Sequence, residues 1–492
     1  MNTNSFARTI LAVFVGLFLF TGVDFGQTFK NGGTLINGSG KTIMATNFQN
    51  FGTAAGTLHN GGTLNVSGTF TNGNGTLNST FNNFYGPLVG GTAVIANFVQ
   101  NSSVDAYNDS STTIGYLKLT ATGSPITSTA GSLSTPKGRV EYGAAGNQTV
   151  AAVTGGYGTL ISTGSGVKTI GSAVAINDSG RIQGSPLKVN GVALTVHGSG
   201  IATVTASDTI DASSPSSSVA YDADAAQSVA PGTYLSLTLS GGTAHRTKAV
   251  SSGDLNLVPT TGSLTLSDTN EVLDIAGASS NFRASSVATF ANSGTIRIAG
   301  SAFFTSGITA GSFDYYGSAQ TIGGAIYNNL TLSGGTGAKT YGGNTSVTGT
   351  YDVSGMTGTS SRSYASVTFT YAGTGASQNV VAGTSLAHEV YFDLAFSGVA
   401  TKSIPTSSFL DATTVQLNAG GAVTNNATFA VGTGGLTNSI TFNNAGPLTI
   451  TGAGATGITN GGTLANTSTI SLTTSDFNNN GTLSNDGTIT VN

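Results

Sequence analysis

The sequence predicts an all-β protein built as a right-handed parallel β-helix, and three observations support this prediction. Only 7% of the 492 residues are charged, although about 25% is usual, and glycine occupies 72 positions. Short segments alternate between apolar and hydroxyl-bearing residues, and short motifs return along the chain. Because such a strand is apolar on one face only, it needs neighbours above and below it, which a solenoid supplies.

The alternating segments indicate which side chains form the core. Period two places leucine and isoleucine on one face of a strand and threonine and serine on the other. We therefore expect a shared core of six residues with exposed hydroxyl-bearing neighbours: Leu237, Leu239, Ile296, Ile298, Leu330 and Leu332. A tandem of β-sandwich domains is the alternative architecture, although the strands are short and the chain lacks Trp and Cys.

A short motif recurs near both ends of the chain. In each copy an Asn-Gly turn precedes a strand start, and glycine and asparagine accept the backbone conformations that tight corners require. The copies span Asn31–Leu35, Asn60–Leu64, Asn460–Leu464 and, in shortened form, Asn480–Leu483.

A longer repeat occupies the middle of the chain, with four copies that each contain a tyrosine, a glutamine, a second tyrosine and a lysine. We expect structural stacking for these residues, and a row binding sugars or an anionic glycan is the alternative. Since the repeats begin 56 to 94 residues apart, each should cover several coils of 20 to 25 residues. The copies are Tyr142, Gln148, Tyr157, Lys168; Tyr221, Gln227, Tyr234, Lys248; Tyr315, Gln320, Tyr327, Lys339; and Tyr371, Gln378, Tyr391, Lys402.

The predicted organisation is a signal peptide over residues 1–26, followed by one continuous solenoid over 27–492. Arg8 supplies the positive charge of the signal, and residues 10–20 are apolar. Within the solenoid, short repeats occupy 27–100 and 416–492, and the longer repeats occupy 101–415. We expect an open C-terminal end, which implies either a fragment of a longer protein or end-to-end self-association.

Composition excludes several classes of function. The net charge is −4, and lysine and arginine form no clusters, so nucleic-acid binding is not expected. The chain has no cysteine, which excludes disulfides, thiolate metal sites and a cysteine nucleophile. No segment beyond the signal is apolar enough for a transmembrane helix.

Few residues suggest chemistry. The weak candidates for a metal site or an acid pair are Asp105 with Asp109 and Asp222 with Asp224, and solvated turns are the competing interpretation. The four histidines lie far apart in sequence, and His388 next to Glu389 is interpreted as a loop contact. We therefore expect no catalytic residue, no metal and no cofactor.

Two of these motifs also carry a resemblance. The Asn-Gly-Gly-Thr-Leu turns and the segment Tyr327–Gly334 resemble those of repetitive, secreted β-solenoid surface proteins and adhesins of Gram-negative bacteria, especially of the Bacteroidetes and Chlorobi group. The resemblance implies a parallel β-helix, an extracellular or outer cell-surface location, and a role in adhesion or matrix building. Such proteins often end in a sorting module, which Gly487–Asn492 does not resemble, so the export route stays open.

The predicted function is a structural or adhesive one, in which hydroxyl-rich faces meet a surface, a matrix or a glycan. A polysaccharide lyase or hydrolase on the same fold is one alternative, but 20 acidic residues offer no convincing catalytic pair. An ice-binding protein is the other. It needs regular threonine rows, and Thr69–Thr71 and Thr449–Thr451 have the required form without recurring at coil spacing.

Overall fold

The structure is a computed structural model. It describes residues 23–50, 57–60, 62–72, 80–82, 92–100, 107–108, 116–128, 135–153, 155–205, 207–241, 246–259, 261–284, 289–304, 309–334, 336–356, 362–383, 389–451, 457–473 and 475–492. Most of the predicted signal peptide, residues 1–22, lies outside this part of the chain. The first strand begins at Val23, so cleavage after Gly26 would remove its first half.

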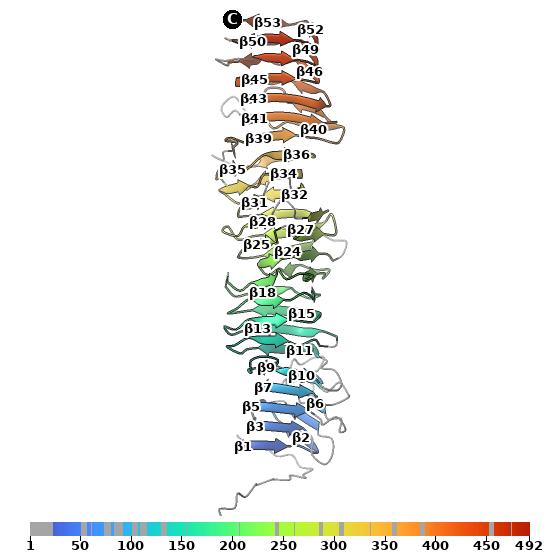
Figure 1. Cartoon of the computed structure of the whole chain (residues 1–492), viewed down its shortest axis with the longest axis vertical. Coiled ribbons are helices and arrows are strands. Elements are labelled where there is room, and N and C mark those ends of the chain that lie inside the picture. Colours follow the sequence, from blue (N-terminus) through green and yellow to red (C-terminus); the bar gives the residue numbers. More distant parts are fainter. Residues whose placement is uncertain are drawn as a thin grey trace, which may run out of the picture. The chain divides into compact units, whose positions relative to one another are not determined.

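The predicted fold class is confirmed. The described residues form strands and no helix, and their parallel sheets stack as a β-solenoid of about 18 turns (Figure 1). Each strand pairs with a strand one turn further along the chain, which is not the arrangement of tandem sandwiches. The chain divides into two compact units, Met1–Gly241 and Gly242–Asn492. Within the described residues, no helix is long and apolar enough to cross a membrane.

Three sheets form the first unit. The first contains, in order, β1 (Val23–Lys30), β3 (Thr42–Asn50), β5 (Thr63–Asn72), β7 (Thr92–Gln100), β9 (Tyr116–Leu119), β11 (Thr135–Tyr142), β13 (Tyr157–Ser162), β15 (Val174–Ile182), β17 (Ala193–Val196), β20 (Ser218–Tyr221) and β23 (Ser236–Leu239), with β10 (Ile126–Ser128) on β7 and β18 (Ile201–Thr203) on β15. The second contains β2 (Thr34–Asn37), β4 (Thr57–Asn60), β6 (Thr80–Asn82) and β8 (Tyr107–Asn108). The third contains β12 (Gln148–Val150), β14 (Lys168–Ile170), β16 (Leu187–Val189), β19 (Ile210–Ala212) and β22 (Gly232–Tyr234); β21 (Gln227–Ser228) completes the unit.

The second unit has one long row of strands and several shorter ones. The long row contains β24 (Arg246–Val250), β27 (Glu271–Ile275), β30 (Thr295–Ile298), β32 (Thr309–Tyr315), β34 (Ile326–Ser333), β36 (Thr345–Val347), β37 (Tyr351–Gly355), β39 (Thr368–Tyr371), β41 (Glu389–Gly398), β43 (Phe409–Gly420), β45 (Thr428–Asn438), β47 (Leu448–Ile450), β48 (Ile458–Asn460), β50 (Thr469–Leu472), β51 (Phe477–Asn479) and β53 (Thr488–Val491). The shorter rows are β25 (Leu255–Leu257), β28 (Phe282–Ala284), β31 (Ala302–Phe304); β26 (Ser263–Leu266), β29 (Thr289–Asn292); β33 (Gln320–Ile322), β35 (Lys339–Tyr341), β38 (Arg362–Ser363); and β40 (Ser377–Asn379), β42 (Thr401–Ile404), β44 (Val423–Asn425), β46 (Thr441–Asn444), β49 (Thr463–Asn466), β52 (Thr482–Asn485).

The core follows the predicted phase of alternation. All six leucine and isoleucine residues predicted to form it are fully buried, with no exposed surface. Their hydroxyl-bearing neighbours, such as Ser236, Thr238 and Thr331, point outward but are half-buried and not exposed as expected. The turns above and below cover part of each outward side chain, which the pattern of a single strand does not reveal.

Asparagine ladders close the corners near both ends of the described chain. In the first unit, the side-chain amide of Asn31 donates to Asn50, and that of Asn50 donates to Asn72, both at 2.8 Å. Rings of Phe29, Phe48, Phe70 and Phe98 also stack at centroid distances of 4.9 to 5.3 Å. These ladders explain why the short motif recurs, since Asn31, Asn60 and Asn460 each supply a rung, whereas in the shortened copy the rung is Asn479 and not Asn480.

Two ladders run through the second unit. In each, the Nδ2 atom of one rung donates to the Oδ1 atom of the next, at 2.5 to 2.9 Å. Asn438, Asn460 and Asn466 also donate to a backbone carbonyl of the next turn, which satisfies a second N–H group. The rungs are Asn425, Asn444, Asn466 and Asn485 in one ladder, and Asn438, Asn460 and Asn479 in the other.

Candidate functional site

The four tyrosine, glutamine and lysine repeats form one structural module. In every copy the glutamine is buried, and its Nε2 atom donates to two backbone carbonyl oxygens of the preceding turn. For Gln148 these are the oxygens of Leu119 and Ala121, at 3.1 and 2.7 Å. For Gln378 they are those of Val347 and Gly349, at 2.8 and 2.7 Å. The glutamines thus join consecutive turns individually through the backbone, and the expected stacking of one glutamine amide on another is wrong.

Each module places its lysine inside the molecule. The Nζ atom of Lys168 donates to the carbonyl oxygens of Ala144 and Gly166, both at 2.8 Å. Lys402 donates in the same way to Gly398 at 3.0 Å and Ala400 at 2.7 Å. Burial lowers the pKa of both lysines, because the charged form loses contact with water. Fully buried lysines cannot form a surface row for an anionic glycan.

The paired tyrosines clamp the backbone of a single residue. Tyr142 and Tyr157 join their hydroxyl groups at 2.8 Å. Ala151 lies between them, and its N–H donates to Tyr142 while its carbonyl accepts from Tyr157, at 3.0 and 2.7 Å. The other copies clamp Ala230, Gly323 and Val381 in the same way. All eight rings are fully buried, so these tyrosines serve packing and not sugar stacking at the surface.

The spacing between the glutamine and the lysine of the repeat reflects the turn of the solenoid. Gln148 pairs with Lys168, Gln320 with Lys339, and Gln378 with Lys402 on adjacent strands of one sheet. The separation of 19 to 24 residues between glutamine and lysine is therefore the length of one turn. This signal was present in the sequence, and it marks where consecutive turns meet.

The acidic candidates do not assemble into a site. Asp222 and Asp224 follow the end of β20, where Asp222 is half-buried and Asp224 is exposed. The Oδ1 atom of Asp222 lies 2.8 Å from the Nδ1 atom of His197, so its partner is a histidine one turn back. Asp105 and Asp109 lie outside the described residues, as do His245 and His388.

No metal site emerges from the described part of the chain. There, no group of three or more His, Cys, Asp or Glu side chains lies close enough together to hold an ion. His59 is half-buried on β4, and burial lowers its pKa. Its neighbours in register are Ile36 and Asn82, which makes it part of an outward row of the sheet.

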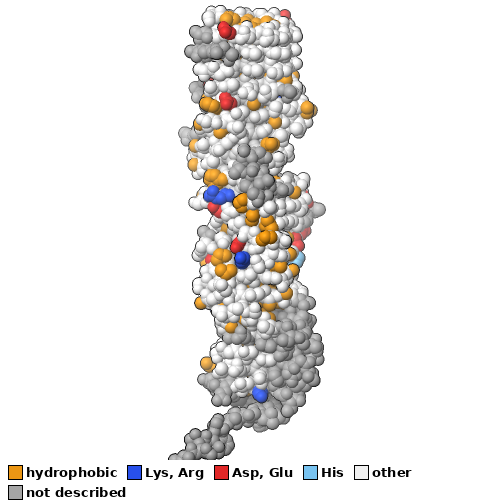
Figure 2. All heavy atoms as spheres, viewed as in Figure 1, with side chains coloured by type: hydrophobic (Ala, Val, Ile, Leu, Met, Phe, Trp, Pro, Cys, Tyr) orange, Lys and Arg blue, Asp and Glu red, His pale blue; other side chains and the backbone are white. Residues whose placement is uncertain are grey.

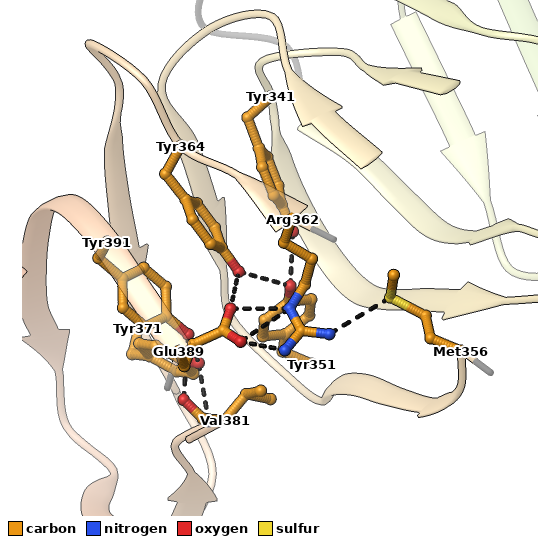
Figure 3. A network of polar contacts seen from close by, with 9 residues as sticks. All are labelled: Tyr341, Tyr351, Met356, Arg362, Tyr364, Tyr371, Val381, Glu389 and Tyr391. Carbon is orange, nitrogen blue, oxygen red and sulfur yellow. Dashed lines mark hydrogen bonds and ion pairs between the residues drawn. The ribbon is translucent and has the colours of Figure 1, made fainter. Parts of the chain in front are cut away.

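An unpredicted polar cluster lies in the second unit (Figure 3). Arg362, on β38, donates to both carboxylate oxygens of Glu389, on β41, including 2.8 Å contacts from its Nε atom. Tyr364 donates to the same carboxylate at 2.6 Å. Hydroxyl contacts of 2.9 and 2.6 Å continue from Tyr364 to Tyr351 and from Tyr351 to Tyr341. Burial lowers the pKa of Arg362, but its hydrogen bonds to Glu389 and the charge of that carboxylate more than offset this and raise it.

This cluster is closed to a substrate of any size. Glu389 is 2% exposed and the Arg362 side chain 18%, and the tyrosines around them are 5% exposed or less. Every polar group drawn in Figure 3 bonds to another member of the cluster or to the backbone. The cluster therefore joins turns that differ in shape, and it gives no access for a reaction.

The outer surface is where this protein can meet another molecule. Residues 42–104 and 412–475 contain no Asp, Glu, Lys or Arg. Over the strands from β42 to β52, one outward row in register contains Ser403, Thr424, Asn443, Ala465 and Ser484. Figure 2 shows that the visible face over these turns is mostly neither charged nor hydrophobic.

Comparisons with known proteins give no relationship. No protein-family model matches the chain, and neither a curated protein nor a solved structure is significantly similar to it.

Proposed function

We propose that this protein is a secreted structural or adhesive element of a bacterial surface. It would present the hydroxyl-rich faces of its solenoid to a surface, a matrix or a glycan. The resemblance of its repeats to those of secreted surface proteins and the predicted signal peptide support the location. The expected end-to-end association stays a prediction.

The observation that carries this proposal is the division of polar groups between inside and outside. The recurring glutamine, lysine, tyrosine and asparagine side chains are buried, and they form hydrogen bonds with the backbone and with one another. The outside retains rows of threonine, serine and asparagine in register from turn to turn. A long, regular, largely neutral surface suits contact over an area, whereas catalysis requires a few groups that converge.

Surface location is the decisive test of the proposal. Antibodies raised against the purified protein should label intact cells of the source organism, and external protease should remove the labelling. Deletion of the gene should reduce attachment of the cells to a surface or weaken their matrix. Protein found only inside cells would contradict the proposal.

We also propose that the protein has no enzymatic activity on polysaccharides. Asp222 contacts His197 and Glu389 contacts Arg362, and both contacts are structural ones. Release of reducing ends or unsaturated products from a polysaccharide panel, abolished by Asp222→Asn or Asp224→Asn, would overturn this.

A second candidate, ice binding, is favoured by one row of threonines. Thr441, Thr463 and Thr482 occupy the same outward position on β46, β49 and β52, so threonine does recur at turn spacing on this face. The row was not predicted, because the expected pattern was two threonines within one strand. Thermal hysteresis that is lost in Thr463→Lys would support this candidate, and its absence would remove it.

A further inference from the structure

An exposed aromatic residue lies in a polar setting on the second unit. On β25, β28 and β31 the outward residues in register are Asn256, Arg283 and Phe303. Phe303 is 41% exposed, although most phenylalanines of the described chain are buried. Figure 2 shows hydrophobic and charged side chains gathered near the level of these strands.

Two contacts hold the guanidinium group of Arg283 in place. Its Nε atom donates to Asp254 at 3.3 Å, and its central carbon lies 4.5 Å from the centre of the Phe303 ring. A planar guanidinium stacked on a ring and bonded through one nitrogen is restrained in orientation. Within the described residues, its two terminal nitrogens have no hydrogen-bond partner, and their N–H groups face solvent because the side chain is 48% exposed.

Hydrogen bonds also hold the carboxylate of Asp254 in a fixed orientation. Its Oδ1 atom accepts from the backbone N–H and the side-chain amide of Asn281, at 2.9 and 3.2 Å. It remains 34% exposed, and a carboxylate has further lone pairs for hydroxyl donors. Donors, an acceptor and an apolar ring therefore lie together on one outward surface, which we name the Arg283 patch (Asp254, Asn281, Arg283 and Phe303).

The charges of the patch decide which partner it suits. Arg283 and Asp254 form an ion pair, so the patch is neutral overall and offers no net attraction to a polyanion. A neutral sugar offers hydroxyl groups that both donate and accept, together with an apolar face of C–H groups. These features match the Arg283 donors, the Asp254 acceptor and the Phe303 ring respectively.

We propose that the Arg283 patch is a binding subsite for a neutral glycan. The inference rests on the proposed adhesive function and specifies one ligand class and one location for it. A single sugar in such a shallow subsite binds weakly, and many copies of the protein on a cell would multiply the strength of attachment.

A second arginine shows why this location is distinct. Arg297 also stacks on a ring, that of Tyr316, at 4.6 Å, and its Nε atom donates to Asp314 at 3.2 Å. Asp274, its other neighbour in register, binds the Tyr316 hydroxyl at 2.8 Å, so two carboxylates face one guanidinium. This second group is net negative, and its aromatic hydroxyl is already engaged.

Saturation-transfer NMR on the full-length mature protein tests the subsite. The probes are cellohexaose, laminarihexaose, maltohexaose and, as an acidic comparison, hexagalacturonate. We expect transfer to the ring C–H protons of at least one neutral hexasaccharide and not to hexagalacturonate. Phe303→Ala should weaken that binding about tenfold.

Phe392 offers a matched control, because it is 42% exposed but makes no contact with a guanidinium within the described residues. Phe392→Ala should leave binding unchanged, and both variants should unfold at the temperature of the parent protein. Equal weakening by both substitutions, preference for hexagalacturonate, or no transfer to any probe would each overturn the subsite. Cell-surface labelling is a separate measurement, so the adhesive role and the subsite can fail independently.

Discussion

Two regions of the second unit satisfy the buried polar groups of their corners with different kinds of side chain. Between Asn425 and Asn485, each corner is filled by an asparagine that repeats in every turn. Between Tyr315 and Lys402, the corners hold tyrosine, glutamine, lysine and an arginine–glutamate pair. Both regions satisfy buried backbone groups, but only the second buries groups that can change their charge. Tolerance of pH and of substitution should therefore differ along the solenoid.

Alkaline pH should separate the two regions most strongly. Burial raises the pKa of Tyr315, Tyr371 and Tyr391 well above 10. Because the folded-state pKa lies above the unfolded value, this stabilisation is complete below pH 10 and is lost progressively as the pH rises above 10. We expect cooperative unfolding of the tyrosine-containing turns in this window, with a rise in tyrosinate absorbance.

Proteolysis at pH 11 with mapping by mass spectrometry should then find cuts between 315 and 402 before cuts between 425 and 485, which contains no tyrosine. Simultaneous cutting of both regions would show that they unfold as one cooperative unit.

Removal of one charge from the buried ion pair should have the next largest effect. Glu389→Gln leaves the Arg362 guanidinium without its counter-charge in a site that is largely shielded from water. We expect a loss of about 3–5 kcal/mol in the free energy of unfolding, measured in urea. Asp314→Asn is the control, because it breaks the more exposed pair with Arg297 and should cost about 1 kcal/mol or less. Similar losses in both variants would show that burial of the pair is unimportant.

A carboxylate placed in an asparagine ladder should make the neutral region sensitive to pH. The side chain of Asn444 accepts a hydrogen bond from Asn425 and donates one to Asn466, and both bonds are buried. Asn444→Asp replaces the donating amide by a second carboxylate oxygen. That oxygen then faces the Oδ1 atom of Asn466, and the hydrogen bond to Asn466 is lost. We expect about 2–3 kcal/mol of destabilisation at pH 7. The folded-state pKa of the new carboxyl should be raised, so stability should recover as the pH falls from 7, and the recovery should be complete below about pH 4. Urea titrations of parent and variant at pH 3.5 and pH 7 provide the measurement.

The smallest effect is expected on the outward face of the same turns. Thr463 points outward between Thr441 and Thr482, and Thr463→Ser removes only a methyl group there. We expect a change within about 0.5 kcal/mol in the free energy of unfolding. A loss above 1 kcal/mol would mean that the half-buried outward rows contribute to stability as the ladders do.

Much of the fold was predictable because it depends on local pattern. Strict alternation placed Leu237, Ile296 and Leu330 in the core, and Asn-Gly pairs marked strand starts. The expected exposure of neighbouring hydroxyls failed because stacked turns shield one another. Ladder asparagines recur six residues apart within a turn, as in Asn460 and Asn466, and this spacing is a sequence signal from which the ladders could have been predicted.

The polar contacts were harder to predict, because they depend on the lengths of loops. Arg362 and Glu389 lie 27 residues apart, in turns that interrupt the regular repeat, and nothing in the spacing of either residue indicates the other. Likewise, Arg283 reaches Asp254 one turn back and Phe303 one turn forward. Only the register of three strands brings these residues together.

The asparagine ladders also bear on how such a chain can change during evolution. Each inner rung, such as Asn444 or Asn466, accepts from the turn before it and donates to the next turn, so the inner rungs are equivalent. Duplication of a DNA segment that encodes one whole turn would insert a rung and leave every hydrogen bond of the ladder intact. Insertion of a single residue would move an asparagine out of line and leave amide groups buried without partners. Selection should therefore accept changes in length in steps of one turn, about 19 to 22 residues in this region.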